Sequence, residues 1–181
     1  MKKILVLAFT IFSAPYLFAQ TSTEVSRDAS GHKILKGFID QKQLASDTAF
    51  GWYAQNLKSF TPNSDVVKNY ASNKDSVNII VFGGTWCGDT QSLLPKFYAT
   101  AEAAGIPANH VTLIGVDESK KTLFNLTEAF AVTNVPTFIV LKNGKEIGRV
   151  VEYGKTGMPE KEVGEIISKS VIKSTAKSKA K

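Results

Sequence analysis

The sequence predicts an α/β protein with a mixed central sheet and helices on both faces of that sheet. Near-continuous apolar runs at 77–83 and 110–117 are typical of strands that are buried on both faces, and helical segments follow them. The later stretch 136–153 contains a turn at Asn143-Gly144, which indicates an antiparallel hairpin. The expected order is β-α-β-α-β-β-α, preceded by a helical N-terminal extension.

The first 19 residues have the pattern of a secretory signal peptide. Lys2 and Lys3 form a positive start, an apolar run covers 4–12, and the small residue Ala19 precedes the expected cleavage site. This apolar stretch is shorter than the ~20 residues that span a bilayer. We therefore expect an exported protein, periplasmic or extracellular, with no stable membrane span after signal cleavage; an uncleaved anchor is the alternative.

Residues 20–75 are expected to form a flexible start and a helical extension. The segment 20–32 is polar and rich in Ser and Thr, which favours flexibility. Apolar residues then recur at three- and four-residue spacing over 40–60, as on one face of a helix. A proline ends this pattern, and a short second helix is predicted with Asn63 or Ser64 as its cap.

Three further helices are predicted after the extension. The helix over 89–105 contains Pro95, which should kink it. A second helix, over 121–132, follows the second buried strand. The last helix covers 158–171, where Pro159 suits the first turn.

The net charge argues against nucleic acid as a partner. The formal charge of +6 comes from two lysines in the signal and four in the tail, so the rest of the chain has no net charge and no basic face. The predicted division of the chain is a signal peptide at 1–19, the extension at 20–75, an α/β domain at 76–172 and a disordered Lys-rich tail at 173–181.

Cys87 is the only cysteine, and it follows the first buried strand at the expected start of a helix. One cysteine cannot form an internal disulfide, so in an exported protein it is a free reactive thiol, a thiol that pairs with another molecule, or an inert buried residue. A helix N-terminus favours an anion. Thr90, one turn further on, is placed to donate a hydrogen bond to a thiolate, whereas the charge of Asp89 opposes the thiolate.

TWCGDT at 85–90 follows a buried strand, NVPTFIV at 134–140 comes some fifty residues later, and the hairpin and the closing helix complete this segment. These three features resemble the thioredoxin-like superfamily. The resemblance covers about 76–171 and includes the proline in the helix after the cysteine. It implies a thioredoxin fold and thiol–disulfide exchange.

The resemblance also implies roles for individual residues. Cys87 would be the nucleophilic thiolate, with Trp86 exposed beside it. The peptide bond before Pro136 would be cis and would face the cysteine. The residues expected to contact an extended substrate are Val135, Pro136 and Thr137.

Three positions depart from the family pattern. Thr90 replaces the resolving cysteine, Asp89 stands where a proline is common, and Val81 replaces a buried acid. Cys87 alone can form a mixed disulfide, but its release needs an external reducing thiol. The predicted activity is therefore monothiol exchange with exported proteins or small thiols, and the alternative is a redox-inactive peptide-binding module.

Other site chemistries fit the sequence poorly, and we expect no cofactor and no metal. A sulfur-containing metal site needs more ligands than one cysteine, and the only histidines are His32 and His110. A peroxiredoxin-like site would have Thr at the position of Gly84. The sequence contains no Gly-rich phosphate loop.

Overall fold

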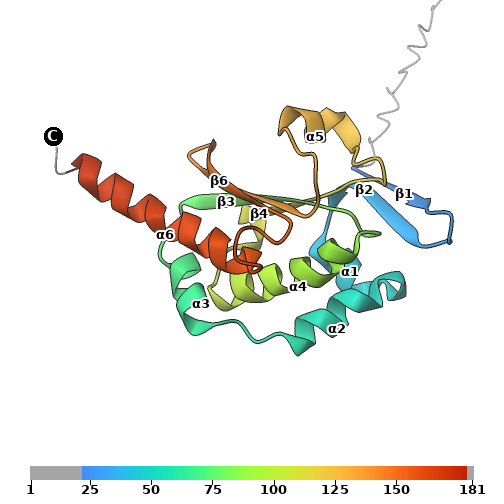
Figure 1. Ribbon diagram of the computed structural model, residues 1–181, viewed down its shortest axis with the longest axis horizontal. Coiled ribbons are helices and arrows are strands. Elements are labelled where there is room, and N and C mark those ends of the chain that lie inside the picture. Colours follow the sequence, from blue (N-terminus) through green and yellow to red (C-terminus); the bar gives the residue numbers. More distant parts are fainter. Residues whose placement is uncertain (1–21, 179–181) are drawn as a thin grey trace, which may run out of the picture.

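The structure is a computed structural model that describes residues 22–178 (Figure 1). Its six-stranded sheet has the order β1-β2-β4-β3-β5-β6. β3 and β4 run parallel, and the pairs β3–β5 and β5–β6 are antiparallel, so the predicted fold class and the order from β3 onward are confirmed.

The strands are β1 (Thr23–Arg27), β2 (Lys33–Ile39), β3 (Val77–Gly83), β4 (Val111–Gly115), β5 (Thr137–Lys142) and β6 (Lys145–Val151). The helices are α1 (Gln41–Ser46), α2 (Gly51–Ser59), α3 (Ser64–Ala71), α4 (Gly88–Ala103), α5 (Leu126–Ala129) and α6 (Pro159–Ser178), with 3-10 turns η1 (Thr48–Phe50), η2 (Ala108–His110) and η3 (Leu123–Asn125).

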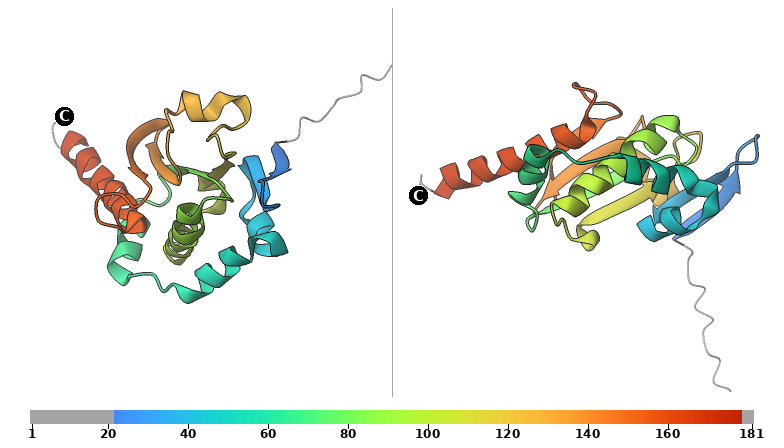
Figure 2. Two further views of the ribbon diagram at one scale, coloured as in Figure 1. Left: turned by 45° about the vertical axis from the view of Figure 1, so that its right-hand side comes forward. Right: turned by 90° about the horizontal axis from the view of Figure 1, so that it is seen from below.

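Helices cover both faces of the sheet, which explains why its central strands are apolar throughout. Figure 2 shows α4 and α2 on one side of the sheet and α5 on the other. In β3, Ile79 and Val81 belong to the core layer around α4, whereas Phe82 belongs to the smaller layer near α5. All three side chains are fully buried. Successive side chains of a strand point to opposite faces, so both sets must be apolar.

The flexible start predicted for 20–32 is wrong for the described residues. β1 pairs antiparallel with β2, and β2 pairs antiparallel with β4. β2 buries Ile34 and Leu35, whereas most side chains of β1 are exposed. The polar sequence of β1 therefore reflects its position as the edge strand, where apolar side chains are not needed.

The helix predicted over 40–60 is divided into α1, η1 and α2. Asp47 interrupts it with an extended backbone, φ −90° and ψ 119°. Its carboxylate accepts a hydrogen bond from the Ala49 N–H and pairs with Lys33 Nζ at 2.6 Å. Such side-chain to backbone bonds compete with a continuous helix. The N-cap of the next helix, α3, is Asn63, which is one of the two residues predicted for it.

The helix predicted over 121–132 is shorter than expected and consists of η3 and α5. Phe124 and Asn125 have φ of 58° and 52°, in the left-handed region, which a continuous right-handed helix does not contain. The predicted hairpin turn is confirmed, with φ of 52° at Asn143 and 71° at Gly144. Positive φ at both central residues matches the twist of the two strands.

The ends of the described region differ from the predicted boundaries. α6 continues to Ser178, beyond the expected start of the tail at Lys173. The predicted signal peptide at 1–19 and the last three residues, 179–181, lie outside the described residues. Between residues 22 and 178, no helix combines the length and the apolarity that a membrane crossing requires.

Gly115→Ala tests the junction of β2 and β4. A Cβ at Gly115 would lie 2.2 Å from the Leu35 carbonyl oxygen, so β2 must shift. We expect a loss of about 1–3 kcal/mol in the free energy of unfolding, measured by chemical denaturation. Gly51→Ala is the control, because nothing lies within 4 Å of that position and its φ is −51°. Equal stability of the two variants would contradict the prediction.

Candidate active site

Cys87 lies where the chain has left β3 and α4 begins. It is the N-cap residue of α4, with φ −84° and ψ 122°, and its carbonyl accepts a hydrogen bond from the Gln91 N–H at 3.0 Å. No side chain caps this end of the helix, so the first N–H groups of α4 face outward near the sulfur. The side chain is half-buried against the smaller core layer. The sulfur thus combines partial access with the positive end of a helix.

Two glycines before the cysteine make room for the side chains around it. A Cβ at Gly83 would lie 2.9 Å from Cγ2 of Thr90, and a Cβ at Gly84 would lie 2.7 Å from the indole of Trp86. Trp86 Nε1 donates a hydrogen bond to the Val116 carbonyl at 3.0 Å. Trp86 is therefore half-buried and packed, which corrects the expectation that it is exposed.

Thr90 supports the loop before the cysteine. Its side chain is buried, and Oγ1 accepts a hydrogen bond from the Gly84 N–H at 3.2 Å. In the described part of the chain, no hydrogen bond joins Thr90 to Cys87; the Cys87 Sγ instead lies 3.5 Å from the Val135 carbonyl oxygen. The Thr90 hydroxyl thus contacts the Gly84 N–H and not the Cys87 sulfur, which was its predicted partner.

The segment before β5 faces the cysteine. The Val135–Pro136 peptide bond is cis. The side chains of Val135, Pro136 and Thr137 are all buried, so the segment presents backbone rather than side chains. The Pro136 carbonyl already accepts a hydrogen bond from the Glu152 N–H at 2.7 Å. Of the three residues predicted to contact a substrate, Val135 is therefore the one whose carbonyl oxygen contacts the Cys87 sulfur.

Thr85 connects the loop before the cysteine to the N-terminal extension. Its Oγ1 accepts a hydrogen bond from the Leu35 N–H and donates one to the Lys33 carbonyl, both at 3.2 Å. The Thr85 carbonyl accepts from Gln91 Nε2 at 2.9 Å, and the Gln91 carbonyl accepts from Asn56 Nδ2 of α2 at 3.0 Å. β2 and α2 therefore support the site. No local sequence pattern indicates this role, because the contacts join segments that are distant along the chain.

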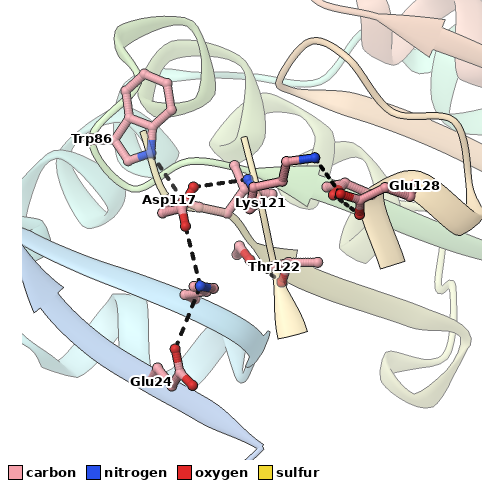
Figure 3. Close-up of polar contacts among 10 residues, drawn as sticks. Glu24, Trp86, Asp117, Lys121, Thr122 and Glu128 are labelled. Carbon is pink, nitrogen blue, oxygen red and sulfur yellow. Dashed lines mark hydrogen bonds and ion pairs between the residues drawn. The ribbon is translucent and has the colours of Figure 1, made fainter. Parts of the chain in front are cut away.

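The loop after β4 is tied to the N-terminal hairpin by a row of charges (Figure 3). Lys36 Nζ lies 3.7 Å from Glu24 Oε2 and 3.2 Å from Asp117 Oδ2. Asp117 also accepts from the Lys121 N–H at 2.9 Å. The side chain of Lys121 donates a hydrogen bond to Glu128, and this bond together with one from the Thr127 hydroxyl lowers the pKa of Glu128 to about 2. Val116, whose carbonyl accepts the hydrogen bond from the Trp86 indole, directly precedes Asp117. This row of charges therefore helps to fix the position of that carbonyl.

A tyrosine from the loop after β6 reaches the start of α4. Tyr153 Oη donates a hydrogen bond to Asp89 Oδ1 at 3.0 Å. This hydrogen bond and the negative charge of Asp89 raise the pKa of Tyr153, and the charge of Cys87 acts in the same direction. Asp89 is one of the site residues predicted from the sequence, whereas Tyr153 is not, because no local pattern indicates a partner 64 residues away.

Three further observations concern the surroundings of the site. Val81, at the position of the family's buried acid, is fully buried in the larger core layer. Residues 22–178 contain no group of three or more His, Cys, Asp or Glu that could hold a metal ion. A pocket of about 350 Å³ is lined by Ile39, Tyr98 and Ile106. Tyr98 lies about three turns along α4 from the cysteine, so this pocket is not part of the site.

Comparison with known sequences decides the family. The thioredoxin family model matches residues 59–163, which is more than half of the chain. The chain belongs to the thioredoxin family. The thioredoxin of Echinococcus granulosus is 37% identical over 89 residues, which are 48% of this chain and 75% of that protein. The thioredoxin of Staphylococcus saprophyticus is 31% identical over 102 residues, 56% and 89% of the two chains. Membership of the thioredoxin family supports a thiol–disulfide redox function in general terms.

Solved structures are similar to a larger part of this thioredoxin-family chain. A Pseudomonas aeruginosa protein of unknown function matches 74% of this chain and 90% of its own, with a TM-score of 0.50 and 17% identity. At that identity the likeness shows the fold alone. The thioredoxin of Fasciola hepatica is 27% identical and matches 59% of this chain and 91% of its own, with a TM-score of 0.38.

Thr90→Val tests the support that Thr90 gives to the loop. The substitution keeps the shape of the side chain but leaves the Gly84 N–H without its acceptor. A buried donor without a partner costs about 1–3 kcal/mol, so we expect a loss of that size in chemical denaturation.

Thr100→Val is the matched control for this variant. Thr100 is equally buried, but its hydroxyl donates to the Lys96 carbonyl one helical turn away. That carbonyl keeps its backbone partner in the helix, so the loss should be smaller. The interpretation fails if Thr90→Val is as stable as the wild type.

Proposed function

We propose that the mature protein is an exported, monothiol thiol–disulfide exchange protein with Cys87 as its nucleophile. The observation that carries this proposal is the position of the sulfur, half-buried at a helix start without a side-chain cap. Because the sequence contains one cysteine, the chain supplies only one of the two thiols that a complete cycle requires.

The exchange proceeds in two displacement steps. The Cys87 thiolate attacks one sulfur of a substrate disulfide, the substrate S–S bond breaks, and the other substrate sulfur leaves as a thiolate that takes a proton from water. The product is a mixed disulfide between Cys87 and the substrate. A thiolate from outside the chain then attacks the substrate sulfur of this bond and releases Cys87. If that second thiolate belongs to the same substrate, the result is isomerisation.

The residues around Cys87 prepare the first step. The free N–H groups at the start of α4 favour the negative sulfur. Thr85 and Trp86 hold the loop through their bonds to β2 and to the Val116 carbonyl, so the sulfur is placed before a substrate arrives. The backbone at Val135 is available beside the sulfur for an extended peptide.

The proposed location is consistent with this chemistry. The signal-peptide pattern at 1–19 would direct the chain to an oxidising compartment, the periplasm or the cell exterior. Disulfide-containing exported proteins and small thiols are then the partners. The second thiol of the cycle comes from a protein or a small molecule in that compartment.

A redox-inactive peptide-binding module is the second candidate function. The contact between Cys87 Sγ and the Val135 carbonyl favours it, because an S–H group donates to a carbonyl and a thiolate does not. Val81 also favours it, since this residue cannot relay a proton. A module of this kind would capture partners without using its sulfur.

Cys87→Ser separates these two functions. We expect cysteine-dependent adducts of the wild type on non-reducing gels of cell-envelope extract after mild oxidation, and none with the serine variant. Partners captured equally by both forms would support the binding module. If the wild type forms no adducts at all, monothiol exchange is excluded.

Thr90→Cys tests whether the missing second thiol limits the cycle. The variant restores two cysteines at the family spacing, so its reduced form should reduce oxidised glutathione without an external thiol and end as an internal disulfide. The wild type should end as a glutathione adduct. Intact mass spectrometry distinguishes the two products, and Thr90→Ser is the control. A wild type that turns over without added thiol would contradict the monothiol mechanism.

A further inference from the structure

The loop between β6 and α6 is anchored at its start to the segment that faces Cys87. The Glu152 N–H donates to the Pro136 carbonyl at 2.7 Å, and Asn134 Nδ2 donates to Glu152 Oε1 at 2.9 Å. Two independent bonds therefore fix the residue that precedes Tyr153. The carboxylate of Glu152 is also directed toward Asn134 by the second bond.

The same loop is anchored at its end to the first turn of α6. Glu162 Oε1 accepts hydrogen bonds from the N–H groups of Lys155 and Thr156, at 2.6 and 2.7 Å, and from Thr156 Oγ1 at 2.9 Å. Gly154 has a φ of +63°, and a Cβ there would lie 2.6 Å from Glu162 Oε1. Glycine is thus required between the two anchors, and Tyr153 is held between them.

Tyr153 connects this anchored loop to the start of α4. The residue is 45% exposed, yet its hydroxyl donates to Asp89 Oδ1 at 3.0 Å. Asp89 follows Cys87 by two residues, in the first turn of α4. A free aspartate at that position can turn back to bind the N–H groups of its own helix. In the described residues the Asp89 carboxylate accepts a hydrogen bond from Tyr153, and no side chain caps the start of α4.

We propose that Tyr153 is a positioning residue that keeps the Asp89 carboxylate at the rim of the site, so that Cys87 reacts faster with cationic and neutral disulfides than with anionic ones. This inference rests on the proposed exchange function and names its substrate class. A fixed negative charge beside the sulfur attracts a disulfide flanked by Lys or Arg and repels a thiol compound that carries carboxylates.

Charged thiosulfonates measure this selectivity directly. The Cys87 thiolate attacks a methanethiosulfonate, a disulfide forms and methanesulfinate leaves, so no other reactant is needed. The aminoethyl reagent is cationic, the sulfonatoethyl reagent is anionic and the methyl reagent is neutral. The measured quantity is the ratio of the cationic to the anionic rate constant at one pH and low salt, and the neutral rate constant is measured separately as a control for thiol accessibility.

We expect Asp89→Asn to lower this ratio about 5-fold, the size expected for one nearby charge screened by water. Tyr153→Phe, which keeps the ring and the Asp89 charge, should lower the ratio at least 2-fold. In the Asp89→Asn background, Tyr153→Phe should change nothing further. Asp65→Asn is the charge-matched control, because Asp65 is an exposed carboxylate on α3 that pairs with Lys68, and it should leave the ratio unchanged.

The outcomes separate the two levels of the proposal. An unchanged ratio in Tyr153→Phe overturns the positioning role, and an unchanged ratio in Asp89→Asn overturns the charge selectivity. A folding defect would alter the neutral rate rather than the ratio. If the neutral reagent does not modify wild-type Cys87 at all, the proposed exchange function itself fails.

Discussion

The site depends on one steric constraint, which is that two successive residues at the end of β3 carry no side chain. The spaces that side chains would fill at Gly83 and Gly84 are occupied by Thr90 and by the indole of Trp86. Because β3 is buried on both faces, the chain must turn sharply into α4 within a crowded edge of the sheet. The two glycines permit this turn, and the turn places Cys87 at the helix start.

Four separate parts of the chain then fix the surroundings of the sulfur. β2 holds Thr85, the loop after β4 holds Trp86, the segment before β5 brings the Val135 carbonyl, and the loop after β6 brings Tyr153 to Asp89. Each contact joins elements that are distant in sequence. The result is a sulfur whose environment is set by the fold before any partner binds.

The sequence predicted those features that depend on a local pattern of residues. The bounds of β3 were predicted as 77–83 because apolar residues fill both faces, and the Asn143-Gly144 turn has its own conformational signature. β1 was missed because an exposed edge strand needs no apolar residues. In the site, Cys87 was predictable from its position before a helix, whereas Thr85 and Tyr153 were not, since their partners lie 50 to 64 residues away.

The contacts of Thr85 make the N-terminal extension a structural part of the site. The family model begins at residue 59, yet both partners of the Thr85 hydroxyl, Lys33 and Leu35, lie well before it. Removing β1 and β2 would leave the Thr85 hydroxyl and the backbone groups at the edge of β4 without their hydrogen-bond partners, at positions that are now buried. We therefore expect that the thioredoxin-like part of this chain does not fold as a self-contained module. Cys87 belongs to a sheet-centred unit that includes β1 and β2, which lie outside the match to the family model.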